Sequence, residues 1–172
     1  DRIFYHLKKK RKVNGLFLSS GVGSDPDRTM EEMIDAVRRI RRWFRGYVHL
    51  KVLPGTDREL IKRASALADR MSINIEAPDK LKMHELSSTK DFKTDILRRQ
   101  SWIKRTGVSQ TSQMIISNDS TDKDIMKMAR WQYNKMNLSR LYYSSFIPVK
   151  GTPMEKERAV NRTRQNRLYN ID

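Results

Sequence analysis

The stretch Met71-Ser72-Ile73-Asn74-Ile75-Glu76 alternates apolar and polar side chains and ends on a carboxylate just before Ala77-Pro78. A period of two over six residues predicts a β-strand with one apolar and one polar face. Residues 47–53 and 113–117 show the same alternation. Several strands with one apolar face each require a layer of helices on that side only.

Stretches with helical spacing separate the strand-like segments along the chain. We expect strands at residues 16–18, 47–53, 71–76, 113–117 and 141–149. We expect helices that start at the capping boxes Thr29-x-x-Glu32 and Thr56-x-x-Glu59, at residues 79–88 and 91–104, and after Thr121. Strand-to-strand spacings of about 25 to 40 residues are typical of βαβ units, which form parallel sheets.

The fold class is therefore α/β, and two architectures remain open. One is a partial TIM-like (β/α) barrel of five parallel strands with helices outside, whose interior holds a ligand. The other is a small open sheet with one solvated face. Buried strands of an open doubly wound sheet are usually apolar on both faces. The polar positions in 47–53 and 71–76 therefore favour the barrel.

The charge of the chain suggests a polyanionic partner. Among 172 residues there are 36 Lys and Arg but 20 Asp and Glu, which gives a formal net charge of +16. Such a charge favours nucleic acid, although a basic helix exterior can also simply be solvated. The candidate nucleic-acid-binding residues are the run Lys8, Lys9, Lys10, Arg11 and Lys12, together with Arg38 and Arg42.

The chain contains no cysteine, which excludes several kinds of chemistry within it. Disulfides, thiolate metal sites, a cysteine nucleophile and a cysteine-ligated iron–sulfur cluster all need that residue. His6, His49 and His84 are too scattered for a metal-binding motif. No apolar run approaches the roughly 20 residues of a membrane helix, and no signal peptide is evident. We predict a cytoplasmic protein without membrane contact.

Two segments carry candidate ligand contacts. The loop Ser19-Ser20-Gly21-Val22-Gly23-Ser24 offers backbone N–H groups for an anion, but it matches no phosphate-binding motif and is equally typical of a plain βα loop. Ser72, Asn74 and Glu76 share one face at the carboxyl end of their strand, where parallel folds bind ligands. A carboxylate there can accept bonds from two ribose hydroxyls, or it can cap the next loop.

Other polar and aromatic strand residues allow two interpretations each. His49 and Lys51 can supply an acid and a cation to the same cavity, although a single strand histidine is more often structural. Tyr142, Tyr143 and Phe146 can stack on bases, but aromatic residues in strands are more often part of the core.

Several stretches resemble the DNA modification/repair family of radical S-adenosylmethionine (radical SAM) proteins. The most specific are VNGLFLSSGV at 13–22 and MSINIE at 71–76. Shorter similar stretches are YVHLK at 47–51, SQMII at 112–116, TDKDI at 121–125, YYSSFIPV at 142–149 and RLY at 167–169. The resemblance runs in order from about residue 13 to the end of the chain.

The resemblance implies a partial (β/α)₆ barrel, with strands two to six present in residues 1–150. In the family, a Cys-x-x-x-Cys-x-x-Cys loop after the first strand holds a [4Fe–4S] cluster, and S-adenosylmethionine is cleaved reductively to a 5′-deoxyadenosyl radical. By position, Ser19, Ser20 and Gly21 would meet the methionine end of S-adenosylmethionine, and Ser72, Asn74 and Glu76 its ribose. Gln113 and Ser117 would lie near the adenine, and Lys51 completes the candidate cofactor-binding set.

The sequence also departs from the family pattern. The usual Gly-Gly-Glu after strand two is Ser19-Ser20-Gly21 here, so its acidic residue is missing or lies elsewhere. The cluster segment would lie upstream of Asp1, and a helix-hairpin-helix segment would follow the basic helical residues 151–172. We therefore expect a piece of a longer protein that is inactive alone, its barrel completed by the missing segments or by another chain.

These observations support two hypotheses about function. The first is the S-adenosylmethionine-binding barrel portion of a radical SAM enzyme that acts in nucleic-acid modification or repair. The second is a non-catalytic, basic α/β module that binds nucleic acid through its phosphates.

Overall fold

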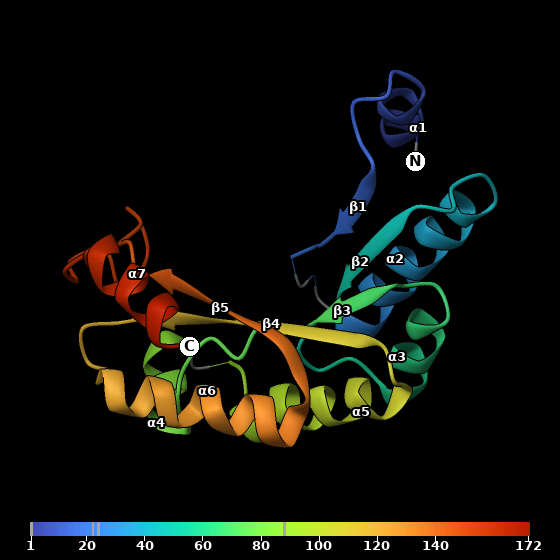
Figure 1. Ribbon diagram of the computed structural model, residues 1–172. Helices are drawn as coiled ribbons and strands as arrows, with labels where there is room; N and C mark the ends of the chain where they lie inside the picture. The colour runs from blue at the N-terminus through green and yellow to red at the C-terminus, as the bar shows by residue number, and fades with distance from the viewer. Residues whose placement is uncertain (1, 22, 24, 88) are drawn as a thin grey trace.

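In the computed structural model, five parallel strands form one sheet in the order β1-β2-β3-β4-β5 (Figure 1). The structure describes residues 2–21, 23, 25–87 and 89–172. The strands are β1 (Gly15–Leu18), β2 (Tyr47–Lys51), β3 (Arg70–Ser72), β4 (Ser109–Ile116) and β5 (Leu138–Ser145). Neighbouring strands are consecutive in the sequence, so the sheet grows in one direction from β1 to β5.

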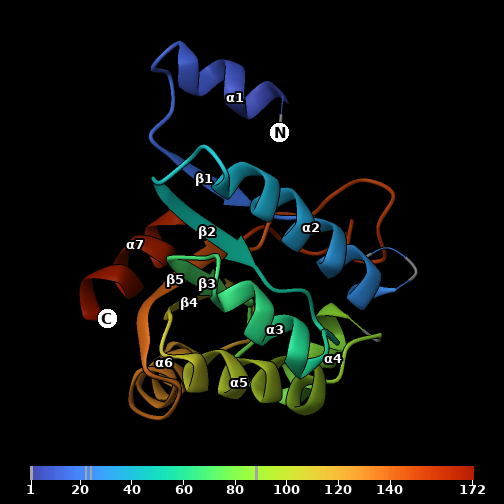
Figure 2. The same cartoon turned by 90° about the vertical axis from the view of Figure 1, so that its right-hand side faces the viewer.

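The helices that connect the strands lie on one face of the sheet, and the opposite face of β2, β3 and β4 is uncovered (Figures 1 and 2). The described helices are α1 (Arg2–Lys9), α2 (Pro26–Arg41), α3 (Arg58–Ser65), α4 (Lys80–Leu86), the π-helix η1 (Phe92–Leu97), α5 (Arg98–Thr106), α6 (Asp122–Met136) and α7 (Arg162–Ile171). The helices from α2 to α6 connect strands, whereas α1 precedes β1 and α7 follows β5. The sheet curves, so that its uncovered face is concave. No helix of the described residues is long and apolar enough to cross a membrane.

The alternation in β2 matches the two faces of the sheet. Val48, Leu50 and Val52 are completely buried under the helices, whereas His49 and Lys51 are only half-buried. On the helix side, the apolar stripe of α2 is buried against the sheet. The predicted α/β fold with five parallel strands and outer helices is confirmed. As the sequence predicts, the apolar side chains of β2 face the helices and its polar side chains face away from them.

Several predicted boundaries were wrong. β3 ends at Ser72 rather than Glu76, and β5 ends at Ser145 rather than residue 149. β4 begins at Ser109, four residues before the alternating stretch. The expected helix at 91–104 is continuous, but its first turns are the π-helix η1.

Two of the predicted helix starts were wrong by one to four residues. Asp25, not Thr29, is the N-cap of α2, because Pro26 can occupy only the first turn and the Asp25 carboxylate accepts from the backbone N–H of Asp27. Asp57, not Thr56, caps α3. Thr121 caps α6 as predicted, and its hydroxyl accepts from the Asp124 N–H.

Side chains from α6 and α7 cover the outer edge of β5. The Tyr133 hydroxyl accepts from Leu141 N–H at 3.0 Å, and the Gln165 Oε1 accepts from Ser145 N–H at 2.9 Å. Between them, the Tyr169 hydroxyl accepts from the N–H of Tyr143 at 2.8 Å and donates to its carbonyl at 3.1 Å. These side chains replace the bonds that a further strand would make.

The two ends of the helices carry opposite charges. Acidic side chains occupy the first turns of α2, α3, η1 and α6, whereas Lys or Arg occupies the last turns of α1, α2, α3, α5 and α6. Charges of this sign stabilise helices through the macrodipole. Because every helix that connects two parallel strands returns to the start of the next strand, the basic turns gather at the amino end of the sheet.

Candidate functional site

The carboxyl end of β3 is shaped by one hydroxyl of β4. The Ser112 Oγ donates to the Ile73 carbonyl at 2.8 Å and accepts from the Ile75 N–H at 3.0 Å. Ser112 is 1% exposed, so these bonds are shielded from water. The serine side chain thus replaces part of the β3–β4 ladder and lets residues 73–75 leave the sheet.

Glu76 rejoins the sheet in a strained conformation. Its N–H donates to the Gln113 carbonyl at 3.1 Å, and its carbonyl accepts from the Ile115 N–H at 2.8 Å. Its φ is 60°, in the left-handed region that costs a side-chain-bearing residue about 1 kcal/mol or more. Two backbone bonds therefore hold a carboxylate in a conformation that glycine would adopt more easily.

A cavity of about 550 Å³ opens at this carboxyl end of the sheet. Glu76 lines it beside the apolar side chains of Ile115 and Phe146. The other lining residues are Met83, His84, Glu85, Leu86, Ser87, Thr89, Lys90, Ile147, Val149, Thr152, Pro153 and Met154. A carboxylate at the end of the sheet next to two apolar side chains suits a ligand that joins hydroxyl groups to a flat apolar ring.

His49 lies on the concave face in a cationic environment. Its Nε2 is 2.8 Å from the Ser72 Oγ, and the Phe17 ring packs against the imidazole at a tilt of 50°, with centroids 4.6 Å apart. Burial, and then the nearby charges of Arg70 and Lys51, lower the pKa of His49 from 6.5 to about 4. At neutral pH this histidine is uncharged, so it can serve as a hydrogen-bonding group but not as a cation or a strong base.

The structure brings some of the predicted cofactor-binding residues together. The Glu76 backbone N–H donates to the Gln113 carbonyl, and Lys51 of β2 lies opposite Ser72 of β3 in the parallel ladder. Asn74 is half-buried in the segment between Ser72 and Glu76.

Of the predicted cofactor-binding residues, Glu76 alone is among those that line the cavity. Ser19, Ser20 and Gly21 are exposed after β1 and do not line it. Val22 and Ser24 of the same loop lie outside the described residues. Ser117 is buried, and its hydroxyl is 3.0 Å from the Ser120 Oγ.

The three candidate aromatic residues of β5 and its continuation have different surroundings. Tyr143 is 2% exposed, and its hydroxyl donates to the Asp172 carboxylate at 3.0 Å, so it belongs to the core. Tyr142 is 42% exposed on the other face of the strand. Phe146 lines the cavity.

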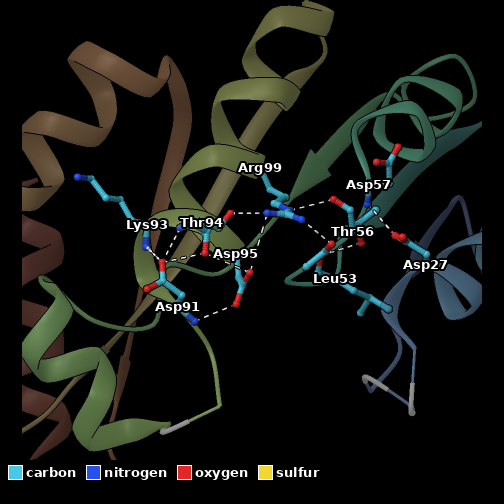
Figure 3. A network of polar contacts seen from close by, with 10 residues as sticks. Asp27, Leu53, Thr56, Asp57, Asp91, Lys93, Thr94, Asp95 and Arg99 are labelled. Carbon is cyan, nitrogen blue, oxygen red and sulfur yellow. Dashed lines mark hydrogen bonds and ion pairs between the residues drawn. The ribbon is translucent and has the colours of Figure 1, made fainter.

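An arginine that the sequence pattern did not single out fastens the loops at the carboxyl end of the sheet (Figure 3). Arg99 donates to the carbonyls of Gly55 and Thr56 in the loop after β2, at 2.6 and 2.9 Å. It also donates to the Thr94 carbonyl in η1. Asp95 lies 3.9 Å away. No local motif marks Arg99, because the carbonyls that it joins to η1, those of Gly55 and Thr56, lie more than 40 residues away in the sequence.

The donor groups of this chain do not fit an iron–sulfur cluster. The sequence has no cysteine. Across the residues that the structure describes, no cluster of three or more His, Asp or Glu side chains is placed to hold a metal ion. S-adenosylmethionine is different, because the cavity at Glu76 has both a carboxylate for hydroxyl groups and apolar walls for a planar base.

Known structures share this arrangement of strands and helices. Methylornithine synthase (PylB) matches with a TM-score of 0.77 and 14% identity, over 92% of this chain and 46% of that protein. HydG, a maturase of the [FeFe]-hydrogenase, matches with a TM-score of 0.75 and 12% identity, over 97% and 40%. Both are radical SAM enzymes. The chain has the fold of a partial radical SAM barrel.

The extent and identity of these matches limit what they show about function. A domain of pyruvate-formate lyase-activating enzyme from Bacteroides vulgatus ATCC 8482 matches with a TM-score of 0.66 and 13% identity, over 92% of both chains. The chain spans less than half of PylB and HydG. No protein-family model and no curated protein matches it. The comparisons therefore establish the fold alone.

Proposed function

We propose that this chain is the S-adenosylmethionine-binding barrel portion of a radical SAM enzyme that modifies or repairs nucleic acid in the cytoplasm. The observation that carries the proposal is Glu76, a strained carboxylate at the carboxyl end of the sheet that opens into a cavity with apolar walls. Strained side-chain-bearing residues persist where the surrounding structure holds them, and they are concentrated at binding sites. The barrel fold shared with PylB and HydG supports the same assignment.

The cavity suggests a role for each of its strand residues. The Glu76 carboxylate would accept hydrogen bonds from the two ribose hydroxyls, a geometry for which a carboxylate has enough lone pairs. Ile115 and Phe146 would pack on the two sides of the adenine ring. Ser19, Ser20 and Gly21 would contact the methionine end of S-adenosylmethionine. When bound beside a reduced cluster, S-adenosylmethionine supplies a carbon radical that removes hydrogen from a substrate.

The cluster must come from outside this chain. β1 is the first strand of the sheet, and no hydrogen bond between described residues reaches its outer edge. A strand with a cysteine-bearing loop, either upstream in a longer protein or in another chain, could pair there. We also propose that the basic helical residues 151–172 would connect this barrel to a downstream region of a longer protein.

Ligand binding by the chain itself tests the cavity. We expect S-adenosylmethionine, titrated by calorimetry, to bind the wild-type chain and to bind Glu76→Gln about tenfold or more weakly, because hydrogen bonds to a charged group are worth about 1.5–3 kcal/mol. The matched control is Glu32→Gln, at an exposed residue of α2 that forms an ion pair with Arg28 at 3.6 Å. Equal affinity of Glu76→Gln and wild type would reject the assignment of Glu76.

Free adenosine separates the parts of the proposal. If adenosine competes for the site and Glu76→Gln weakens it equally, the nucleoside end occupies the cavity. If neither adenosine nor S-adenosylmethionine binds, the non-catalytic basic module becomes the better explanation of this chain.

A further inference from the structure

Basic and aromatic side chains meet where α1 and the end of α2 come together, and we call this surface the α1–α2 corner. Tyr5, Lys8 and Lys12 come from α1 and the turn after it. Arg42, Trp43 and Arg45 follow the last turn of α2. Both segments directly precede a strand, so the corner lies at the amino end of the sheet, opposite the Glu76 cavity.

Aromatic contacts hold α1 at this corner. The Phe4 ring lies 4.9 Å from the Phe44 ring and 5.6 Å from the Trp43 ring, and the Tyr5 ring meets Trp43 edge-on at 5.1 Å. The Lys8 Nζ lies 5.6 Å above the Phe44 ring. No residue of α1 is buried. These contacts therefore position the helix, and its basic end, against α2.

The cations of the corner are left for an external partner. Among the described residues, no carboxylate forms an ion pair with Lys8, Lys12, Arg42 or Arg45. Two other arginines of α2 differ. Arg38 pairs with Asp35 at 2.6 Å, and Arg41 is fixed by Asp69 and by two backbone carbonyls. The predicted contribution of Arg38 to nucleic-acid binding would therefore have to compete with an existing ion pair.

The aromatic side chains of the corner are accessible as well as fixed. Tyr5 is 51% exposed, and Trp43 is 37% exposed although it packs on Phe4. Tyr47, at the start of β2, is 42% exposed, with the Arg70 guanidinium 5.8 Å from its ring. Fixed aromatic rings between unpaired cations are typical of surfaces on which unpaired bases stack while phosphates meet Lys and Arg.

We propose that the α1–α2 corner binds single-stranded nucleic acid. The phosphates contact Lys12, Arg42 and Arg45, and unpaired bases stack on Tyr5 and Trp43. A duplex offers phosphates but hides the faces of its bases, so the aromatic part of the surface favours a single strand. This inference deepens the proposed function and rests only on its nucleic-acid part.

The location of the corner gives it an anchoring role. Ligands of parallel α/β folds bind at the carboxyl ends of the strands, whereas the corner is at the opposite end. A single-stranded nucleic acid bound at the corner is held by its phosphates and by bases that are remote from the Glu76 cavity. The corner therefore sets affinity for the polymer and leaves the cavity unobstructed.

The experiment measures fluorescence anisotropy of a labelled 20-nucleotide thymidine oligomer with the whole chain over a series of salt concentrations. We expect affinity to fall steeply with salt and to fall about tenfold or more at fixed salt in Lys12→Glu/Arg42→Glu/Arg45→Glu. The matched control is Lys123→Glu/Lys150→Glu/Lys156→Glu, which changes the net charge equally at exposed lysines away from the corner. An equal loss in both triple variants would overturn the proposal.

The aromatic contribution is tested separately. Tyr5→Ala should weaken the oligomer about fivefold or more, and Tyr5→Phe should bind like wild type, because a phenyl ring retains the stacking face. Circular dichroism checks that helix content is unchanged. Tighter binding of a duplex of the same length, or of phosphatidylserine vesicles, would overturn the assignment to single strands. S-adenosylmethionine binding should be unchanged in every corner variant, so failure here is distinguishable from failure of the cavity.

Discussion

The outer edges of the first and last strands of the sheet differ in their hydrogen bonding. On β5, hydroxyl and amide oxygens from α6 and α7 accept from the three outward N–H groups of Leu141, Tyr143 and Ser145. On β1, no described residue makes a hydrogen bond to the outer edge, and Phe17 is 59% exposed. A covered edge cannot accept another strand, whereas an open one can. The sheet can therefore be extended past β1 but not past β5.

The largest effect is expected when the cover of β5 is removed. Leu168 is completely buried and anchors α7. Leu168→Ala should lower the free energy of unfolding by about 2–5 kcal/mol, measured by urea denaturation, because it leaves a cavity under α7. Loosening α7 should also expose β5, so that light scattering detects association. Ile171→Ala, at a residue 64% exposed on the same helix, should change stability by less than about 0.5 kcal/mol. Similar values for the two variants would contradict the anchoring role.

A smaller effect is expected when the edge cover loses one hydroxyl and keeps its ring. Tyr169→Phe removes both bonds to the backbone of Tyr143 and should cost about 1–2 kcal/mol in the same assay. Hydrogen exchange should show faster exchange at the Tyr143 amide, since this outward-facing N–H loses the Tyr169 hydroxyl as its acceptor. The exposed Tyr142→Phe is the control. Unchanged exchange at Tyr143 would show that the hydroxyl does not cover this edge.

Acid should lower the free energy of unfolding through His49 of β2. The pKa of His49 is about 4 in the folded protein and 6.5 in the unfolded chain, so the unfolded chain binds more protons between these values. Stability from His49 is therefore complete above pH 6.5 and is lost as the pH falls toward 4. The loss is about 1–2 kcal/mol, less than the full shift implies, because solvent screens the partly exposed imidazole. Urea denaturation at several pH values should show this loss in wild type. In His49→Gln the loss should be absent over the same range. Identical pH profiles would refute the origin in His49.

The smallest change in stability is expected at the open edge itself. Phe17→Lys places a charge on β1, where charged side chains prevent strand-to-strand association. We expect concentration-dependent association of the wild-type chain in sedimentation experiments, and less of it in Phe17→Lys. The unfolding free energy should change by less than about 1 kcal/mol, since only the ring contact with His49 is lost. The matched variant Tyr142→Lys, on the covered strand, should associate like wild type. Equal association of all three chains would indicate contact elsewhere.

The sequence predicted those parts of the fold that depend on local periodicity. Alternation in β2 placed Val48, Leu50 and Val52 on the buried face, and the Thr121 cap was located correctly. The cap of α2 was misplaced because Thr29-x-x-Glu32 also satisfies the capping-box pattern, while Pro26 actually opens the helix after Asp25. A local pattern of this kind does not distinguish between two candidate caps four residues apart.

The remaining errors have non-local causes. β3 is short because the Ser112 hydroxyl, about 40 residues away, takes over its bonds to Ile73 and Ile75. The cover of β5 also depends on residues distant in the sequence, since Tyr169 lies 26 residues from its partner Tyr143. At the candidate site, the alternation placed Glu76 on the polar face with Ser72 and Asn74, and the family resemblance placed Gln113 in the same region. It could not indicate the positive φ of Glu76 or the apolar walls of the cavity.

The opposite charges at the two ends of the helices give the molecule a preferred orientation before any contact forms. A chain of net charge +16 with acidic first turns near the carboxyl ends of the strands and basic last turns at the amino ends has an uneven distribution of charge along the sheet. In the field of a polyanion, such a distribution turns the protein during diffusion and raises the rate of productive encounters, an effect that added salt removes. The amino end of the sheet would arrive first. The Glu76 cavity would then face the solvent, free to exchange small molecules while the protein stays on its polymer.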